Sequence, residues 1–236
     1  MGTDNLFHKK RQRRERELRR IQEIRAVHDL VLIICEGSKT EPLYFKALRA
    51  HLHLNKEMIV IPDRLKGNDP LSLVKTAEAE FLKEQKKDPE KQGYDHVFVV
   101  FDKDSHASYN NALQKMTSMS KKTNGKFKAI SSIPCFEVWL LLHFEEATQP
   151  YAASGNNSIC DNVIHDLKRY IHDYEKGSRG VFETTYPTVD KAIAFAQSLE
   201  IRHKRDGTDN PSTKVHLLIT YLQEIKHIWD GVRLAY

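Results

Sequence analysis

Three acidic residues directly follow apolar segments of the chain. Glu36 comes after the run Leu30–Cys35, and Asp102 and Asp104 come after the run His96–Phe101. Residues i and i+2 of an extended segment point to the same side, so the sequence predicts that Asp102 and Asp104 face one site. Three like charges at one site repel one another, and a hard divalent cation with oxygen ligands relieves this repulsion. We therefore predict a Mg²⁺ or Mn²⁺ site built from Glu36, Asp102 and Asp104.

A simpler interpretation treats the same residues as ordinary acids at strand ends, with Glu36 capping a turn. Short acidic motifs are common in loops, so an isolated D-x-D motif carries little information. Two separate apolar strands that end in acids, first E-G and then D-x-D, are harder to obtain by chance. Gly37 also lacks a Cβ, which would let a ligand or the backbone approach closely. The order of the motifs favours the metal site.

The segments that position these acids alternate between strands and helices. Short apolar runs typical of buried parallel strands occupy residues 30–35, 58–61, 96–101 and, more weakly, 127–132. Helices are expected at Pro42–Leu48, with Thr40 as N-cap, and at Pro70–Lys87, Ala112–Met119 and Phe136–Phe144. This pattern predicts an α/β fold with a mostly parallel four-stranded sheet flanked by helices. Functional groups collect beyond the carboxyl ends of strands in such sheets, and both acidic motifs fall there.

After Phe144 the pattern changes to helices joined by polar connections. We expect helices at Ile159–Tyr174, Val189–His203 and Thr213–Trp229, and no further strand. Residues 152–158 and 176–180 are expected to be loops, and the second could move over a bound substrate. The predicted organisation is a basic N-terminal arm at residues 1–27, an α/β core at 28–145 and a helical C-terminal portion at 146–236 that packs on the core.

The N-terminal arm concentrates the positive charge of the chain. Its candidate nucleic-acid contacts are Lys9, Lys10, Arg11, Arg13 and Arg14. Each phosphate that such a side chain neutralises releases counterions and adds sequence-independent affinity. A solubilising tail explains the same residues equally well, and the formal net charge of +5 fits both interpretations.

Several classes of protein are not expected. No apolar run approaches the ~20 residues that cross a bilayer, and the N-terminus lacks the features of a signal peptide, so we expect a cytoplasmic protein without membrane contact. Cys35, Cys135 and Cys160 are too few and too scattered for a disulfide framework or a zinc site. Nothing in the chain resembles a Walker A loop, so ATP use by this chain is not expected.

Four segments of the chain resemble a known family: Ile34–Phe45, Phe101–Asp104, Ile133–Phe144 and Pro211–Val215. Together they look like RloB-like proteins, and the resemblance runs from about residue 28 to residue 225. It implies a Toprim-like domain, the fold shared by topoisomerases, primases and OLD-type nucleases. It also implies nuclease activity in bacterial anti-phage defence and abortive infection, together with an ATPase partner protein.

The resemblance implies roles for the acids. Glu36 matches the Toprim glutamate, a metal ligand or general acid/base, and Asp102 and Asp104 match its metal-binding D-x-D. Glu41 is displaced by one position from the second acid of OLD-type nucleases, so it either joins the metal site or simply favours the positive end of its helix. Glu137 opens the helix after the fourth strand, where an acid in an apolar segment needs a partner: a second metal, a cap or a buried ion pair.

If two metals bind, about 4 Å apart, one would activate water and the other would steady the departing oxygen of a phosphodiester. Lys39 could stabilise the phosphate, or be a solvent-exposed turn lysine. Lys103 is expected to face solvent or to pair with an acid. His106 and His143 could transfer protons, although histidines in such settings are usually structural.

Lys214 follows a loop and opens a predicted helix. The N–H groups at such a helix start could hold phosphate. The alternative is a plain helix start with Ser212 or Thr213 as cap.

Three hypotheses follow for the whole chain. The first is a metal-dependent nuclease that cleaves RNA, tRNA among them, or DNA. The second is a non-catalytic Toprim-like regulatory or nucleic-acid-binding module that works with an ATPase partner. The third is nucleotidyl transfer as in primases, ranked last because the chain has no zinc motif and little room for accessory domains. The sequence leaves the substrate and the oligomeric state open, a homo-oligomer included.

Overall fold

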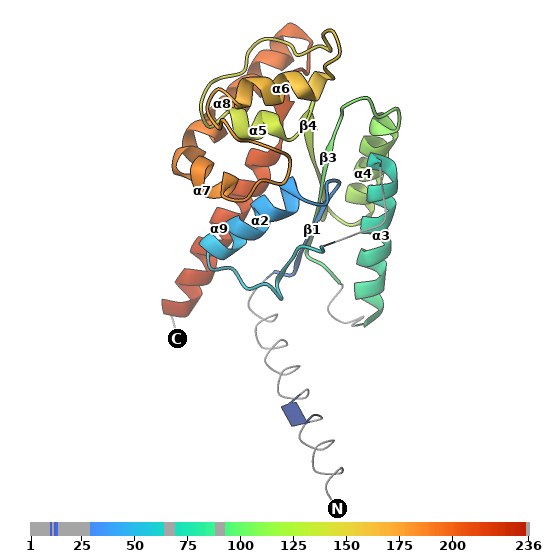
Figure 1. Ribbon diagram of the computed structural model, residues 1–236. Coiled ribbons are helices and arrows are strands. Elements are labelled where there is room, and N and C mark those ends of the chain that lie inside the picture. Colours follow the sequence, from blue (N-terminus) through green and yellow to red (C-terminus); the bar gives the residue numbers. More distant parts are fainter. Residues whose placement is uncertain (1–9, 11, 14–28, 64–68, 88–92, 235–236) are drawn as a thin grey trace, which may run out of the picture.

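A five-stranded sheet forms the centre of the molecule (Figure 1). The structure is a computed structural model, and it describes residues 10, 12–13, 29–63, 69–87 and 93–234. The strands lie in the order β2-β1-β3-β4-β5. Their bounds are β1 Val31–Cys35, β2 Ile59–Val60, β3 His96–Asp102, β4 Phe127–Ile133 and β5 Ser212–Thr213.

The four strands predicted from the sequence form the parallel part of the sheet. β1 pairs with both β2 and β3, and β3 pairs with β4, in each case in parallel. β1 is buried over its first four residues, because helices cover both faces of the sheet. The prediction of a mostly parallel sheet flanked by helices is confirmed.

The predicted number of strands was wrong. β5 adds a fifth, antiparallel strand, in which Ser212 pairs with Ile133 and Thr213 with Ser132. The Ser132 and Thr213 hydroxyls also lie 2.9 Å apart in a buried hydrogen bond. Two residues are too few to produce an alternating pattern, so the sequence offered only the polar start of the helix that follows.

The helices form two layers. Their bounds are α2 Thr40–His51, α3 Pro70–Lys87, α4 Tyr109–Lys122, α5 Glu137–Leu141, α6 Ile159–Leu167, α7 Val181–Thr185, the 3₁₀ helix η2 Tyr186–Thr188, α8 Val189–Asp206 and α9 Val215–Leu234. Helices α3 and α4 cover one face of the sheet, while α2 and the helices from α5 to α9 lie on the other (Figure 1). The division of the chain at residues 27 and 145 remains a prediction.

Several helix predictions differ from the structure in length. α6 begins at a capping box, in which Ser158 and Asp161 exchange hydrogen bonds, but it ends at Leu167, well before Tyr174. α5 ends at Leu141, three residues before Phe144. α7 was not predicted, since its five residues are too few to show a helical period. Thr40 is not the N-cap of α2; Lys39 occupies that position without a side-chain cap.

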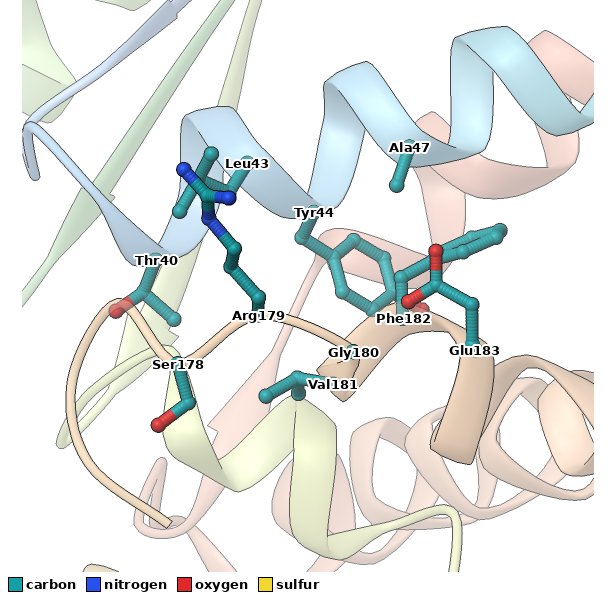
Figure 2. A pocket seen from close by; sticks show the side chains of 10 residues that line it. All are labelled: Thr40, Leu43, Tyr44, Ala47, Ser178, Arg179, Gly180, Val181, Phe182 and Glu183. Carbon is teal, nitrogen blue, oxygen red and sulfur yellow. The ribbon is translucent and has the colours of Figure 1, made fainter.

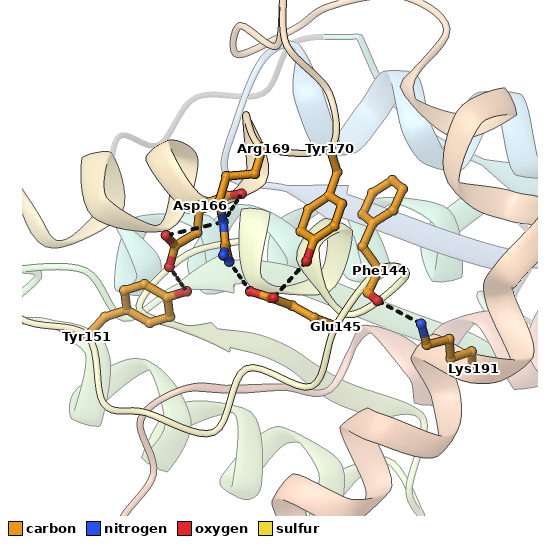
Figure 3. A network of polar contacts seen from close by, with 7 residues as sticks. All are labelled: Phe144, Glu145, Tyr151, Asp166, Arg169, Tyr170 and Lys191. Atoms are coloured by element: carbon orange, nitrogen blue, oxygen red, sulfur yellow. Dashed lines mark hydrogen bonds and ion pairs between the residues drawn. The ribbon is translucent and has the colours of Figure 1, made fainter.

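A polar network holds the segment after α5 against the segment after α6 (Figure 3). The Glu145 carboxylate accepts hydrogen bonds from Arg169 and from the Tyr170 hydroxyl, the latter at 2.7 Å. The Tyr170 ring stacks on Phe144 with centroids 4.9 Å apart. The Lys191 ammonium of α8 donates to the Phe144 carbonyl at 2.6 Å. These contacts tie α5, α6 and α8 together beside the sheet.

Two further predictions concern the basic N-terminal arm and membrane-spanning helices. Lys10 and Arg13 of the basic arm are helical and exposed, whereas Lys9, Arg11 and Arg14 lie outside the described residues. Among the helices that the structure describes, none combines the length and apolar character needed to cross a membrane.

Candidate active site

Acidic side chains from four elements line one cavity at the carboxyl end of the parallel strands. The cavity has a volume of about 310 Å³. Its acids, here called the acidic cluster, are Glu36, Glu41, Asp102, Asp104 and Glu137. Lys39, His106 and Lys176 line the same cavity.

The pairing of β1 with β3 brings Glu36 to Asp102. The two strands are parallel neighbours with Cys35 opposite Val100, and the Glu36 N–H extends the ladder by donating to the Val100 carbonyl at 2.9 Å. The Glu36 Oε2 atom then accepts a hydrogen bond from the Asp102 N–H at 3.0 Å. This carboxylate thus adds a side-chain link to the backbone pairing at the ends of the two strands.

Asp102 and Asp104 reach the same cavity by a turn. β3 ends at Asp102, and Asp104 has a φ of 32°, in the left-handed region that an aspartate adopts more readily than most residues. The Asp104 N–H donates to the Pro134 carbonyl at 2.9 Å, which fixes the turn against the end of β4. Lys103 points elsewhere and pairs with Asp209 at 2.7 Å. The extended i, i+2 geometry assumed from the sequence was wrong, although the two acids do share one cavity.

Glu41 lies against Gly37 on the first turn of α2. Its Oε1 atom accepts a hydrogen bond from the Gly37 N–H at 3.3 Å. A Cβ built on Gly37 would lie 2.1 Å from the Glu41 Oε2 atom, so only glycine permits this approach. The close neighbour that Gly37 admits is therefore a carboxylate of the acidic cluster.

Glu137 is the most enclosed acid, with 2% of its surface exposed. Its Oε1 atom accepts a hydrogen bond from the Tyr174 hydroxyl at 2.9 Å. Its Oε2 atom is buried and has no hydrogen-bond partner among the described residues. The Lys176 ammonium lies 4.0 Å from this atom, a distance that leaves the oxygen open to a further ligand.

The electrostatics of the cluster disfavour full ionisation. Burial raises the pKa of Asp102 well above its usual value, and the charges of Glu41 and Glu137 raise it further. Burial also raises the pKa of Glu41, with added repulsion from Glu137 and Glu36. The pKa of Glu36 is raised by burial despite the hydrogen bond from Asp102 and the nearby His106. A cation at this site would relieve these costs.

A family model described as RloB-like protein matches residues 31–222. The chain belongs to the RloB-like family. The match spans all five strands and every member of the acidic cluster of this RloB-like chain. No curated protein and no solved structure matches it.

Two residues that sequence reasoning undervalued or missed contact the acidic cluster of the RloB-like chain. The His106 Nε2 atom lies 2.9 Å from the Glu36 Oε1 atom. Its place just after the D-x-D motif was the signal available. Lys176 comes from the segment after α6, which was predicted to be a loop that could move over a bound substrate but not to carry a cation into the site.

Other candidate residues of the RloB-like chain lie away from the cluster. Lys214 lines a separate cavity together with Lys128 and Tyr221, and its N–H donates to the Ser131 carbonyl. It lies before the first residue of α9, and the Thr213 hydroxyl accepts from the Val215 N–H at 3.2 Å. The structure thus supports the plain helix start for Lys214 and does not bring it to the acids.

His143 is buried in the protein interior, away from the acidic cavity. It is 1% exposed, and its Nδ1 atom lies 2.9 Å from the Trp139 carbonyl oxygen. Burial lowers its pKa to about 4. A buried histidine outside the acidic cavity has no route to a substrate, so a role in proton transfer is not supported.

The acids of the RloB-like chain are close but not arranged as ligands around one point. In the part of the chain that the structure describes, no group of three or more His, Cys, Asp or Glu side chains is preformed to hold a metal ion. The five acids nevertheless offer only carboxylate oxygens, which suit Mg²⁺ and Mn²⁺, and the buried Glu137 Oε2 atom accepts no hydrogen bond from any described residue. The chemistry of these side chains therefore fits such an ion, although their present arrangement is not a preformed ligand set.

Proposed function

We propose that this RloB-like protein is a divalent-metal-dependent nuclease that hydrolyses phosphodiester bonds. The observation that carries the proposal is the acidic cluster itself. Carboxylates from the ends of β1 and β3 and from the first turns of α2 and α5 line one cavity, which lysines and a histidine share. The mostly parallel sheet flanked by helices and the family resemblance support a Toprim-like core, and the resemblance matches Glu36 to the glutamate of that core and Asp102 and Asp104 to its D-x-D motif.

The residues that would hold Mg²⁺ or Mn²⁺ are Glu36, Asp102 and Asp104, with Glu41 and Glu137 available for a second ion. Bound there, the metal would supply a water of lowered pKa and positive charge for the phosphate oxygens. The raised pKa values of Glu36, Glu41 and Asp102 support this assignment, because a cation would favour their ionised forms.

The other side chains of the cavity supply orientation and charge. Lys39 and Lys176 are exposed at the cavity, and their ammonium groups are suited to hold the anionic backbone of a nucleic acid. His106 contacts Glu36 at 2.9 Å and thereby orients that carboxylate. The basic N-terminal residues Lys10 and Arg13 would add affinity that does not depend on sequence.

The proposed substrate is RNA, with tRNA among the candidates, or DNA. We place this activity in bacterial anti-phage defence in the cytoplasm, where an ATPase partner would control it, because these are the properties that the resemblance implies.

A second function has one observation in its favour. Since no group of three acids in the described ranges is preformed around a single point, the fold could serve as a non-catalytic module that binds nucleic acid. Binding of nucleic acid without turnover on any substrate, in the presence of Mg²⁺ or Mn²⁺, would support that module.

The test is a cleavage assay with purified protein. Total tRNA, single-stranded RNA, single-stranded DNA and plasmid DNA are incubated with Mg²⁺ or Mn²⁺, with and without a chelator. We expect cleavage of at least one substrate that stops with the chelator and in Glu36→Gln and Asp102→Asn, but continues in the control Asp206→Asn, whose residue pairs with Arg205 away from the cavity. Undiminished cleavage in folded Glu36→Gln and Asp102→Asn would reject the proposal.

A further inference from the structure

A second cavity adjoins the acidic one, between α2 and residues 178–183 (Figure 2). It has a volume of about 300 Å³, and we name it the α2–α7 cleft. Thr40 lines both cavities, and its hydroxyl accepts a hydrogen bond from the Gly177 N–H at 2.9 Å. The chain therefore passes from Lys176 in the acidic cavity to Arg179 in the cleft within three residues.

The walls of the cleft are apolar and aromatic. The rings of Tyr44 and Phe182 meet edge to face with centroids 5.3 Å apart, and Ala47 and Val181 add small apolar surfaces. Leu43, 41% exposed, also lines the cleft and adds to its apolar surface. The volume lies at the lower end of the range for ligand pockets, so it suits one flat ring system better than a folded peptide.

Polar groups stand at both ends of the cleft. Figure 2 shows Arg179 extending toward Leu43 and α2, on the side of Thr40 and Ser178, with Glu183 on the other side. The Arg179 side chain is exposed, and its guanidinium makes no hydrogen bond or ion pair with any residue that the structure describes. A guanidinium can stack on a heteroaromatic ring or bind phosphate, and a carboxylate can accept from an exocyclic amino group.

Cations connect the two cavities. The Lys39 side chain lies against Gly177, where an added Cβ would approach the Lys39 Cβ to 2.8 Å. Residues 176–179 thus carry Lys176 at the acidic cavity and Arg179 at the cleft, and Lys39 lies against the same segment at Gly177. A single-stranded nucleic acid matches this surface, because its anionic backbone can contact the cations while one of its aromatic bases enters the apolar cleft.

We propose that the α2–α7 cleft binds one nucleobase of a single-stranded nucleic acid whose backbone lies at the acidic cavity. The position of the backbone rests on the proposed function. The base is unstacked from its neighbours and held between the apolar walls, with Arg179 over its open side. This contact makes the protein select single-stranded over base-paired substrate, since a paired base cannot enter the cleft.

The experiment compares two substitutions on α2. Ala47→Phe fills the cleft, because Ala47 lines it, whereas Ala50→Phe adds the same side chain at an exposed position of the same helix. Fluorescence anisotropy in a chelator measures binding of labelled RNA and DNA single strands of about twelve nucleotides, and of an abasic strand of the same length. Arg179→Gln, at an exposed position, serves as a second variant that leaves the fold intact.

We expect the wild type to bind one or both base-containing strands more tightly than the abasic strand, by roughly 5- to 150-fold, the range of one stacked base. Ala47→Phe should lose this preference and keep its affinity for the abasic strand, Arg179→Gln should weaken the preference, and Ala50→Phe should retain it. Equal affinity of the wild type for all strands, no binding at all, or an intact preference in folded Ala47→Phe would overturn the proposal.

The two proposals fail in different ways. If Ala47→Phe removes the base preference and the protein cleaves no substrate, the nuclease proposal is rejected and the cleft remains a base-binding site. Metal-dependent cleavage with no base preference rejects the cleft and keeps the nuclease.

Discussion

The Glu36 carboxylate accepts a hydrogen bond from the Asp102 N–H at 3.0 Å, and this side-chain contact adds to the backbone ladder between the ends of β1 and β3. Residues 66 positions apart in the chain are thereby held at one cavity. The contact uses one oxygen of Glu36, while its other oxygen lies 2.9 Å from His106. A metal ion that binds Glu36 would therefore compete with the histidine and leave the link to β3 in place.

Loss of either joined acid is expected to abolish cleavage. Removal of residues that merely support metal ligands costs about 10- to 100-fold in metal affinity or activity. We therefore expect Glu36→Gln and Asp102→Asn each to lower the rate by about 100-fold or more in a Mn²⁺-dependent cleavage assay. A loss of similar size in Asp206→Asn would show that the assay reports folding and not the site.

Gly37→Ala is expected to disturb the site with little effect on the fold. The new Cβ would meet the end of the Glu41 side chain, which can rotate away at small cost, and this displaces the carboxylate from the cluster. We expect metal affinity to fall by about 10- to 100-fold, measured by titration calorimetry, with a nearly unchanged Tm. Asp206→Asn, whose residue pairs with Arg205 away from the cavity, is the control and should bind metal normally.

Asp102→Asn is expected to stabilise the metal-free protein at neutral pH. The pKa of Asp102 is raised in the folded state, so the stability that it contributes is lost as the pH rises from the unfolded pKa through the folded pKa. Asparagine carries no charge and avoids this loss. The Tm of Asp102→Asn should exceed that of the wild type by roughly 2–4 °C for each kcal/mol recovered, and the difference should shrink toward acidic pH. A lower Tm at pH 7 in a chelator would contradict the assigned repulsion.

His143 is expected to make the fold sensitive to mild acid. Its pKa is lowered from 6.5 to about 4 by burial, so its contribution to stability is complete above the unfolded pKa and is lost as the pH falls toward 4. The loss between neutral pH and pH 4 amounts to roughly 3 kcal/mol. Denaturant unfolding at several pH values should show a shallower pH dependence in His143→Gln than in the wild type.

The exposed His172 supplies the control for that comparison. Its imidazole is exposed, so His172→Gln should follow the wild-type pH dependence. Identical pH profiles of the wild type and His143→Gln would show that the buried imidazole does not govern the acid sensitivity.

The parallel sheet and the place of Glu36, Asp102 and Asp104 could be predicted because they depend on local patterns. Buried strands produce continuous apolar runs, and the carboxyl ends of neighbouring parallel strands meet at one edge of the sheet. The assumed geometry of the D-x-D motif was less reliable, since the turn at Asp104 depends on the Pro134 carbonyl from another strand.

The features that were missed depend on contacts between distant segments. β5 exists because two residues before α9 pair with the end of β4. Lys176 reaches Glu137 because the chain after α6 turns back over the sheet and is fixed there by the bond from Gly177 to Thr40. The role of Gly37 required the position of the Glu41 carboxylate, which a sequence does not give.

The most direct measurement is the binding of Mn²⁺ to the wild type, Asp102→Asn and Asp206→Asn by isothermal titration calorimetry at neutral pH. The account predicts saturable binding to the wild type and to Asp206→Asn, and a loss of about 10-fold or more in affinity for Asp102→Asn. Equal Mn²⁺ affinity in all three proteins, or no binding to the wild type, would contradict the assignment of the acidic cluster as a cation site.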